Sequence, residues 1–235
     1  LLNSLKQCLG ALTASLLTPN RIGEYGAKAI YFNKGFRKKI VLLNLLSNIT
    51  QMSVTTLFGI TGFIFFILHY EIDIKYIRIL KFTLILILVF TFSFFGIKKS
   101  KLKIKGNSIS KIKQFITQIP VSTHIKSLLL SISRYLVFSF QFFFLLTIFG
   151  ANVSYLNAMI VISSMYLLSS IIPSVFIFDV IIKGSVAVYL FSIVEVNDLT
   201  VYSIVTLMWI LNFVWPSVFG SYFVINFNFP EEENS

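Results

Sequence analysis

The sequence predicts an all-α, polytopic membrane protein, and three observations support this fold class. Of the 235 residues, 56% are hydrophobic and only 12% are charged, whereas a soluble domain carries about 25% charged residues. The mean hydropathy is +0.85. The apolar residues also gather into runs of the length that a membrane-crossing helix needs, about 20 residues. The same composition excludes disorder, collagen and coiled coil, and the single cysteine, Cys8, excludes a disulfide scaffold.

Apolar segments separated by polar or basic connections are expected to be the membrane segments. The first ends at Thr18-Pro19-Asn20, and turn residues close the fourth at Gly150. A charged segment, 21–32, is too short to span alone. The seven apolar segments cover residues 1–17, 40–68, 79–97, 125–149, 156–172, 174–194 and 201–225.

We expect these segments to form one transmembrane domain, 1–235, with an acidic C-terminal tail, 226–235. The chain begins at Leu1 without an initiator methionine, so we expect it to be N-terminally incomplete.

The basic residues predict the orientation. The net charge is +11, but the basic runs lie between apolar segments rather than on a soluble domain, which disfavours nucleic-acid binding. Two basic loops, 33–39 and 98–126, hold 12 of the 20 Lys and Arg residues, whereas the alternate loops 70–78, 150–155 and 195–200 hold two. Cytoplasmic loops are enriched in Lys and Arg. We therefore expect a multi-pass cell-membrane protein with both basic loops and the C-terminal tail in the cytoplasm.

Two motifs share the order proline, acid and lysine. The acid follows the proline after five or six residues and the lysine follows the acid after four, as Pro19, Glu24 and Lys28 and as Pro173, Asp179 and Lys183. The spacing of four places each acid and lysine on one helix face, with the acid in the favourable N-terminal place. Each proline divides an apolar run, which predicts two broken, re-entrant-like helical hairpins with Pro19, Gly23 and Pro173 as hinges. Alternatively, each arm of a hairpin crosses the membrane fully. In either case the motifs point in opposite directions, as in an inverted repeat with a site near the midplane.

Six ionisable residues in or beside the apolar segments are candidates for substrate binding: Arg21, Glu24, Lys28, Arg134, Asp179 and Lys183. A charge at the bilayer centre costs at least about 2.5–3.5 kcal/mol, so it indicates function by default. Four of these residues are cationic and two are anionic, so the set carries an excess of two positive charges. The arginine fork suits phosphate, so an anionic lipid headgroup is the expected partner. Structural salt bridges, and Arg134 snorkelling to the interface, are the alternatives.

Polar stripes extend this candidate site. Asn44, Asn48, Gln51 and Thr55 share one helix face, as do Ser127, Ser131, Arg134 and Gln141. They predict either a cavity lining or hydrogen-bonded helix contacts. Asn48, Gln51 and Gln141 therefore join the candidate substrate-binding residues. His69 and His124 stand alone, without metal-ligand spacing, and no cofactor motif is present, so we expect neither a metal nor a cofactor.

The segment 17–28 resembles a signature of the transmembrane region of lysylphosphatidylglycerol synthetase and its stand-alone, flippase-like relatives. That family shows Pro-x-x-x-Gly-Glu followed by a basic residue, which Pro19, Gly23, Glu24 and Lys28 match. A later family motif has proline, a glycine cluster and glutamate. Pro173 and Asp179 take its first and last places here, without the glycine cluster. The resemblance in span pattern covers most of the chain. It implies movement of a modified phospholipid between leaflets, because the family's aminoacyl transfer belongs to a separate soluble domain.

The leading hypothesis is therefore a flippase-like protein, not an enzyme, that binds and translocates an anionic or aminoacylated phospholipid or another lipid-linked substrate. The alternatives are an ion- or proton-coupled carrier of a small solute, a membrane-embedded enzyme acting on lipid-linked substrates, and a structural partner subunit. The expected partners are anionic membrane lipids, together with a second copy of the chain or an upstream lipid-modifying enzyme.

Overall fold

The structure, a computed structural model, describes residues 2–16, 18, 22–70, 115, 117–172 and 176–228, and within them it is all-helical. The chain divides into two compact units, Leu1–Phe66 with Ile125–Ser235, and Ile67–His124. The elements are α1 (Leu2–Ala14), α2 (Gly23–Ile30), α3 (Lys34–His69), α6 (Val121–Ile148), α7 (Tyr155–Ile171), α8 (Phe176–Ser192), α9 (Asp198–Trp209), a π-helical turn η2 (Ile210–Val214) and α10 (Trp215–Ile225). The predicted span 79–97 lies outside the described residues.

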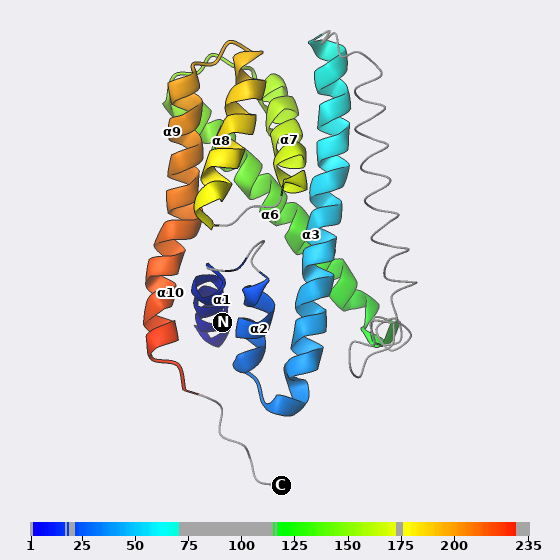
Figure 1. The fold of residues 1–235 in the computed structure, drawn as a ribbon. Helices are drawn as coiled ribbons and strands as arrows, with labels where there is room; N and C mark the ends of the chain where they lie inside the picture. The colour runs from blue at the N-terminus through cyan, green and yellow to red at the C-terminus, as the bar shows by residue number, and fades with distance from the viewer. Residues whose placement is uncertain are drawn as a thin grey trace. The chain divides into compact units, whose positions relative to one another are not determined.

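Three helices of the described part are long and apolar enough to cross a membrane. They are α3 with 36 residues, α6 with 28, and a continuous rod of 28 residues made of α9, η2 and α10. Figure 1 shows the rod running without interruption from α9 into α10. At 1.5 Å per residue each is longer than the hydrocarbon core of about 30 Å. The expected apolar segments 40–68, 125–149 and 201–225 all lie in these helices, apart from Phe149 directly after α6.

The prediction of basic loops at 33–39 and 98–126 is wrong for most of the residues of these ranges that the structure describes. Residues 34–39 form the first turns of α3, and residues 121–126 form the first turns of α6. Lys and Arg have high helix propensity, and their long stems can follow the helix while the charges reach water. Each helix therefore begins before its apolar run, and the positive charges sit on its first turns.

Side-chain caps and turns define several helix ends. The Ser154 hydroxyl accepts from the Asn157 N–H at the start of α7, and Asn197 Oδ1 accepts from the Leu199 and Thr200 N–H groups at the start of α9. These caps satisfy N–H groups that have no partner within the helix. Gly150 has a φ of +75°, which suits the turn expected after α6.

Small residues allow close helix contacts within the larger unit. A side chain at Gly220 of α10 would meet the Leu9 carbonyl and Thr13 hydroxyl of α1, and Thr13 Oγ1 donates to the Ser217 carbonyl at 2.9 Å. Figure 1 shows α1 beside α10. Similar contacts bring α3 to α7, through Gly59 and Gly62, and α8 to α9, through Gly184. This type of packing is typical of membrane helices, which associate through close backbone approach.

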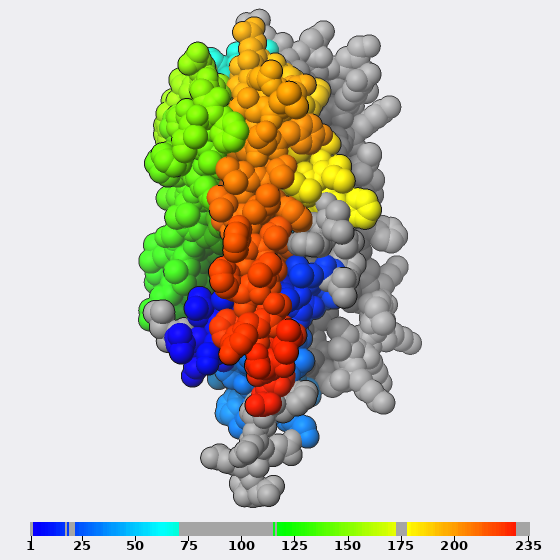
Figure 2. Space-filling model, turned by 90° about the vertical axis from the view of Figure 1, so that its left-hand side faces the viewer, coloured from blue at the N-terminus to red at the C-terminus, as the bar shows by residue number. Residues whose placement is uncertain are grey.

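Large side chains fill the core of this unit, and equally large ones remain outside it. The fully buried ones include Phe142, Leu146, Ile162, Leu190, Phe191 and Ile204. The Phe142 and Phe191 rings stack at 5.4 Å and join α6 to α8. The outer face of α10 exposes Trp215, Phe219, Tyr222 and Ile225, on a rod that Figure 2 shows uncovered along one face. Exposed apolar patches of this extent are typical of a membrane interaction surface.

Replacing Gly220 by Ala should destabilise the fold by about 1–3 kcal/mol, because the new methyl meets backbone atoms of α1 that cannot rotate away. Gly26→Ala in α2 is the matched control, because open space surrounds a side chain there. In a helix that change should be neutral or stabilise by about 0.5–1 kcal/mol. Denaturant titration in detergent measures both, and equal stability of the two variants would contradict the α1–α10 contact.

Candidate functional site

A cavity of about 430 Å³ lies within the larger unit, walled by α3, α6, α7, α8, α9 and the π-helical turn. The three membrane-length helices reach it at their mid-lengths. Gln51, Arg134 and Asn212 each lie within one residue of the midpoint of α3, α6 and the α9–α10 rod, respectively. In a helix that crosses a bilayer fully, the midpoint is the level where polar groups are most costly. Three polar side chains therefore line the cavity near the midpoints of three membrane-length helices.

The ion pair Asp179–Lys183 forms part of the cavity wall. Asp179 lies in the first turn of α8, where the helix dipole favours a negative charge, and Lys183 follows one turn later. Lys183 Nζ lies 2.6 Å from Asp179 Oδ2. The Asp179 side chain is 25% exposed and that of Lys183 46%, so the pair borders the cavity and also reaches the protein surface.

Arg134 adds a second cation to the same wall. Its guanidinium lies 5.6 Å from the centre of the Phe138 ring, one turn further along α6. It forms no ion pair with any residue in the described part of the chain. With Arg134 and Lys183 positive and Asp179 negative, the charged residues of the lining sum to 2 − 1 = +1. The cavity therefore presents one positive charge without a protein counter-ion among the described residues.

The rest of the lining is largely apolar and aromatic. Phe138 and Phe142 come from α6, Met165 from α7, and Trp209 and Phe213 from the α9–α10 rod. Cavities for small ligands combine such a lining with a few placed polar groups. The cavity accordingly suits an amphipathic ligand with one negatively charged group.

Asn212 belongs to the site and was missed by the sequence reasoning. Its side-chain amide donates to Gln141 Oε1 at 3.0 Å and to the Met208 carbonyl at 2.9 Å. It lies in the π-helical turn, a local irregularity that occurs often at functional sites. Gln141 itself does not line the cavity but positions Asn212 from α6. The available signal was a lone asparagine in the middle of an apolar span.

Two polar groups in the cavity wall lack hydrogen-bond partners in the described structure. The Tyr166 hydroxyl is buried without a partner, and so is that of Ser169, both on α7. An unsatisfied buried hydroxyl costs about 1–3 kcal/mol, so most are paired. By contrast, the neighbouring Tyr135 donates to Ser163 Oγ at 2.9 Å. These two hydroxyls are therefore unsatisfied donors buried in the wall of the cavity.

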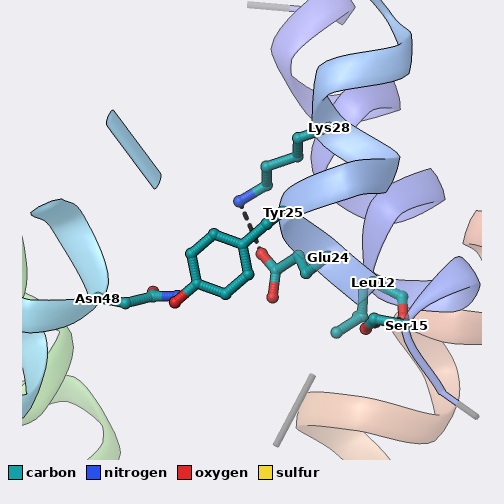
Figure 3. A network of polar contacts seen from close by, with 6 residues as sticks. All are labelled: Leu12, Ser15, Glu24, Tyr25, Lys28 and Asn48. Atoms are coloured by element: carbon teal, nitrogen blue, oxygen red, sulfur yellow. Dashed lines mark hydrogen bonds and ion pairs between the residues drawn. The ribbon is translucent and has the colours of Figure 1, made fainter. Parts of the chain in front are cut away.

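A second polar cluster lies on α2 and does not border the cavity (Figure 3). Lys28 Nζ lies 2.6 Å from Glu24 Oε1, and each of these side chains is about three-quarters buried, with 23% and 24% exposed. Between them in sequence, Tyr25 points to α3, where Asn48 Nδ2 donates to its hydroxyl at 2.6 Å. The Gly23 N–H begins the helix and donates to Thr18 Oγ1 at 2.9 Å.

The predicted site residues thus fall into two groups. Gln51, Arg134, Asp179 and Lys183 line the cavity, and Gln141 contacts it through Asn212. Glu24, Lys28 and Tyr25 form the second cluster on α2, the helix that Gly23 begins, together with Asn48 of α3. Arg21, Pro19 and Pro173 lie outside the described residues, so their roles stay predictions. No group of three His, Cys, Asp or Glu side chains that could hold a metal occurs in the part of the chain that was described.

Comparisons with protein-family models, with curated proteins and with solved structures find no match to this chain.

Replacing Tyr166 by Phe should raise the free energy of unfolding by about 1 kcal/mol, because it removes a buried hydroxyl that has no partner. Tyr135→Phe is the matched control on the neighbouring ring. It breaks the bond to Ser163 and should cost about 0.5–1.5 kcal/mol. Thermal unfolding of the two variants in ligand-free detergent makes the comparison. A loss at Tyr166 as large as that at Tyr135 would show that the Tyr166 hydroxyl is paired.

Proposed function

We propose that this chain is an integral membrane protein that binds a phospholipid with an anionic headgroup in the mid-depth cavity and moves it between leaflets. The observation that carries the proposal is the convergence of polar side chains at the midpoints of three membrane-length helices. A structural site has no need of this arrangement, because apolar residues would pack there at lower cost. A translocation pathway needs it, since a charged headgroup must pass the centre of the bilayer.

The charge of the cavity supports an anionic headgroup. A phosphate would give Arg134 a partner for its planar fork, and Lys183 could turn from Asp179 to the same phosphate. The lining net charge of +1, from two cations and one anion, would then be neutralised. Acyl chains would lie against Phe138, Trp209 and the exposed apolar helix faces.

The short helices support a broken-hairpin arrangement. α1 has 13 residues and α2 has 8, so at 1.5 Å per residue they are about 20 and 12 Å long, less than the hydrocarbon core of about 30 Å. α1 packs against α2, and α7 against α8, and each acid–lysine pair lies on the second helix of its pair. We propose that these are the two halves of an inverted repeat, with α1–α2 re-entrant. Figure 1 shows both pairs.

The remaining sequence predictions enter the proposal unchanged. The basic first turn of α3 would face the cytoplasm, with the C-terminal tail on the same side. The match of Gly23, Glu24 and Lys28 to the lysylphosphatidylglycerol synthetase membrane region supports a flippase-like origin. A non-enzymatic role, and a partner that is either a second copy or a lipid-modifying enzyme, stay predictions. Asp179 in the cavity makes proton-coupled solute transport the second candidate.

In liposomes, the chain should exchange fluorophore-labelled anionic phosphatidylglycerol between leaflets faster than zwitterionic phosphatidylcholine. An impermeant reductant that bleaches the outer label measures this exchange. Arg134→Gln should slow it about 10- to 100-fold, which corresponds to the loss of a charge-assisted hydrogen bond. Glu24→Gln should also abolish exchange while leaving insertion intact.

Lys126→Gln is the matched control for Arg134, because it removes the same charge from an exposed place on the same helix. Its exchange rate should equal that of the wild type. Wild-type rates in Arg134→Gln, or no exchange of either lipid by folded wild-type protein, would overturn the proposal. Uptake of a small solute that depends on a pH gradient would then favour the second candidate.

Binding can be measured apart from exchange, because the chain has two tryptophans and only Trp209 lines the cavity. Trp215 is 53% exposed on the outer face, so Trp215→Phe leaves Trp209 as the sole reporter. Brominated phosphatidylglycerol should quench Trp209 in this background, and Arg134→Gln should raise the lipid concentration for half-quenching about tenfold or more. Equal quenching by brominated phosphatidylcholine would contradict headgroup selection.

A further inference from the structure

The polar face of α3 continues beyond the cavity. Gln51 and Thr55 line the cavity, whereas Asn48 and Asn44 continue the same face toward the basic first turns of the helix. From Gln51, next to the midpoint of α3, to Asn44 the rise is about 10 Å, or about two thirds of half of a hydrocarbon core of about 30 Å. The face therefore extends from the cavity most of the way to the basic first turns of the helix.

The part of this face outside the cavity, at Asn44 and Asn48, has an incomplete set of hydrogen bonds. The Asn44 amide nitrogen is buried and has no partner among the described residues. Asn48 is exposed and bonded only through its amide nitrogen, which donates to the Tyr25 hydroxyl. Helix contacts that serve packing alone would satisfy such groups, because an unpaired amide costs about 1–3 kcal/mol. This part of the face therefore has hydrogen-bonding capacity that no described residue uses.

Tyr25 of α2 reaches the middle of this face. Figure 3 shows Tyr25 crossing from α2 to Asn48, with Glu24 and Lys28 on the same helix. A single hydrogen bond between two side chains, exposed in this structure, is weak enough to break and re-form. The Lys28 ammonium next to it is an attractive group for a phosphate that reaches this point.

We propose that the α3 face of Asn44, Asn48, Gln51 and Thr55 is a hydrated track along which a phosphate-bearing headgroup passes between the cavity and the basic end of α3, and that the Tyr25–Asn48 hydrogen bond closes it. This inference rests on the proposed translocation function. The headgroup exchanges hydrogen bonds from one polar side chain to the next, while the acyl chains stay in the lipid beside exposed residues such as Leu45 and Ile49. The substrate is thereby limited to lipids whose headgroup can bond to neutral amides and hydroxyls as well as to cations.

Cysteine accessibility tests the track, because Cys8 is the only cysteine and Cys8→Ser gives a cysteine-free background. Single substitutions to Cys at Asn44, Asn48, Gln51 and Thr55 should react in liposomes with a charged, impermeant thiol reagent. Ile49→Cys and Leu57→Cys are the controls on the exposed apolar side of the same helix. Thiolate is the reactive form and needs water, so the track positions should react about tenfold faster or more.

The outcomes separate the track from the cavity. Rates at Asn44 and Asn48 equal to those at Ile49 and Leu57, with fast reaction at Gln51 and Thr55, would overturn the track and leave the proposed function standing. Slow reaction at all four positions would overturn both the track and the proposed translocation function. Fast reaction at all four, slowed by added phosphatidylglycerol but not by phosphatidylcholine, is the expected result.

Exchange provides a second measurement that does not depend on thiol chemistry. Asn48→Leu fills the track with an apolar side chain of similar size, so exchange of phosphatidylglycerol should fall about tenfold, as expected for the loss of hydrogen bonds to a charged group. Quenching of Trp209 should persist, because lipid still reaches the cavity from the other leaflet. Ile49→Leu should leave both unchanged. Wild-type exchange in Asn48→Leu would overturn the track.

Discussion

The structure depends on one constraint: charged and amide side chains line a cavity among helices that are largely apolar. A charge in apolar surroundings costs several kcal/mol unless it is paired. Asp179 and Lys183 solve this locally, since one helical turn separates them and their charged atoms lie 2.6 Å apart. Arg134 has only the face of Phe138 among the described groups. The salt bridges of the described residues thus leave Arg134 without a carboxylate partner.

Close backbone contacts and one helical irregularity surround the cavity. Glycines let α3 approach α7 and let α8 approach α9, which ties the walls together through contacts that do not need large side chains. The π-helical turn interrupts the α9–α10 rod where the rod borders the cavity. This turn carries Asn212, whose amide is fixed by Gln141 from the neighbouring α6. Tight packing elsewhere and an irregular turn here together leave a space lined by both polar and aromatic side chains.

The two acid–lysine pairs have the same local geometry but different surroundings. In both, the ammonium lies 2.6 Å from the carboxylate, one turn away. Asp179–Lys183 borders the cavity, whereas Glu24–Lys28 lies beside the Tyr25–Asn48 hydrogen bond on α3. One helix therefore contacts both polar regions, because Asn48 and Gln51 are three residues apart on a single face of α3.

The sequence by itself determined the helical class, the approximate extent of the long apolar helices and the two i,i+4 ion pairs, because each depends on composition or on spacing within one helix. It also placed Gln51 on a polar face of its helix. It could not show that Gln51, Arg134, Asp179 and Lys183 meet in one cavity, since that depends on how separate helices cross. The sequence analysis did not predict Asn212, whose position follows from a π-helical turn. It also predicted a loop where the basic first turns of α3 lie, because charge alone does not end a helix. Features that depend on spacing within one helix could thus be predicted from the sequence. Only the tertiary structure decided which polar groups share a site and which of them lack a partner among the described residues.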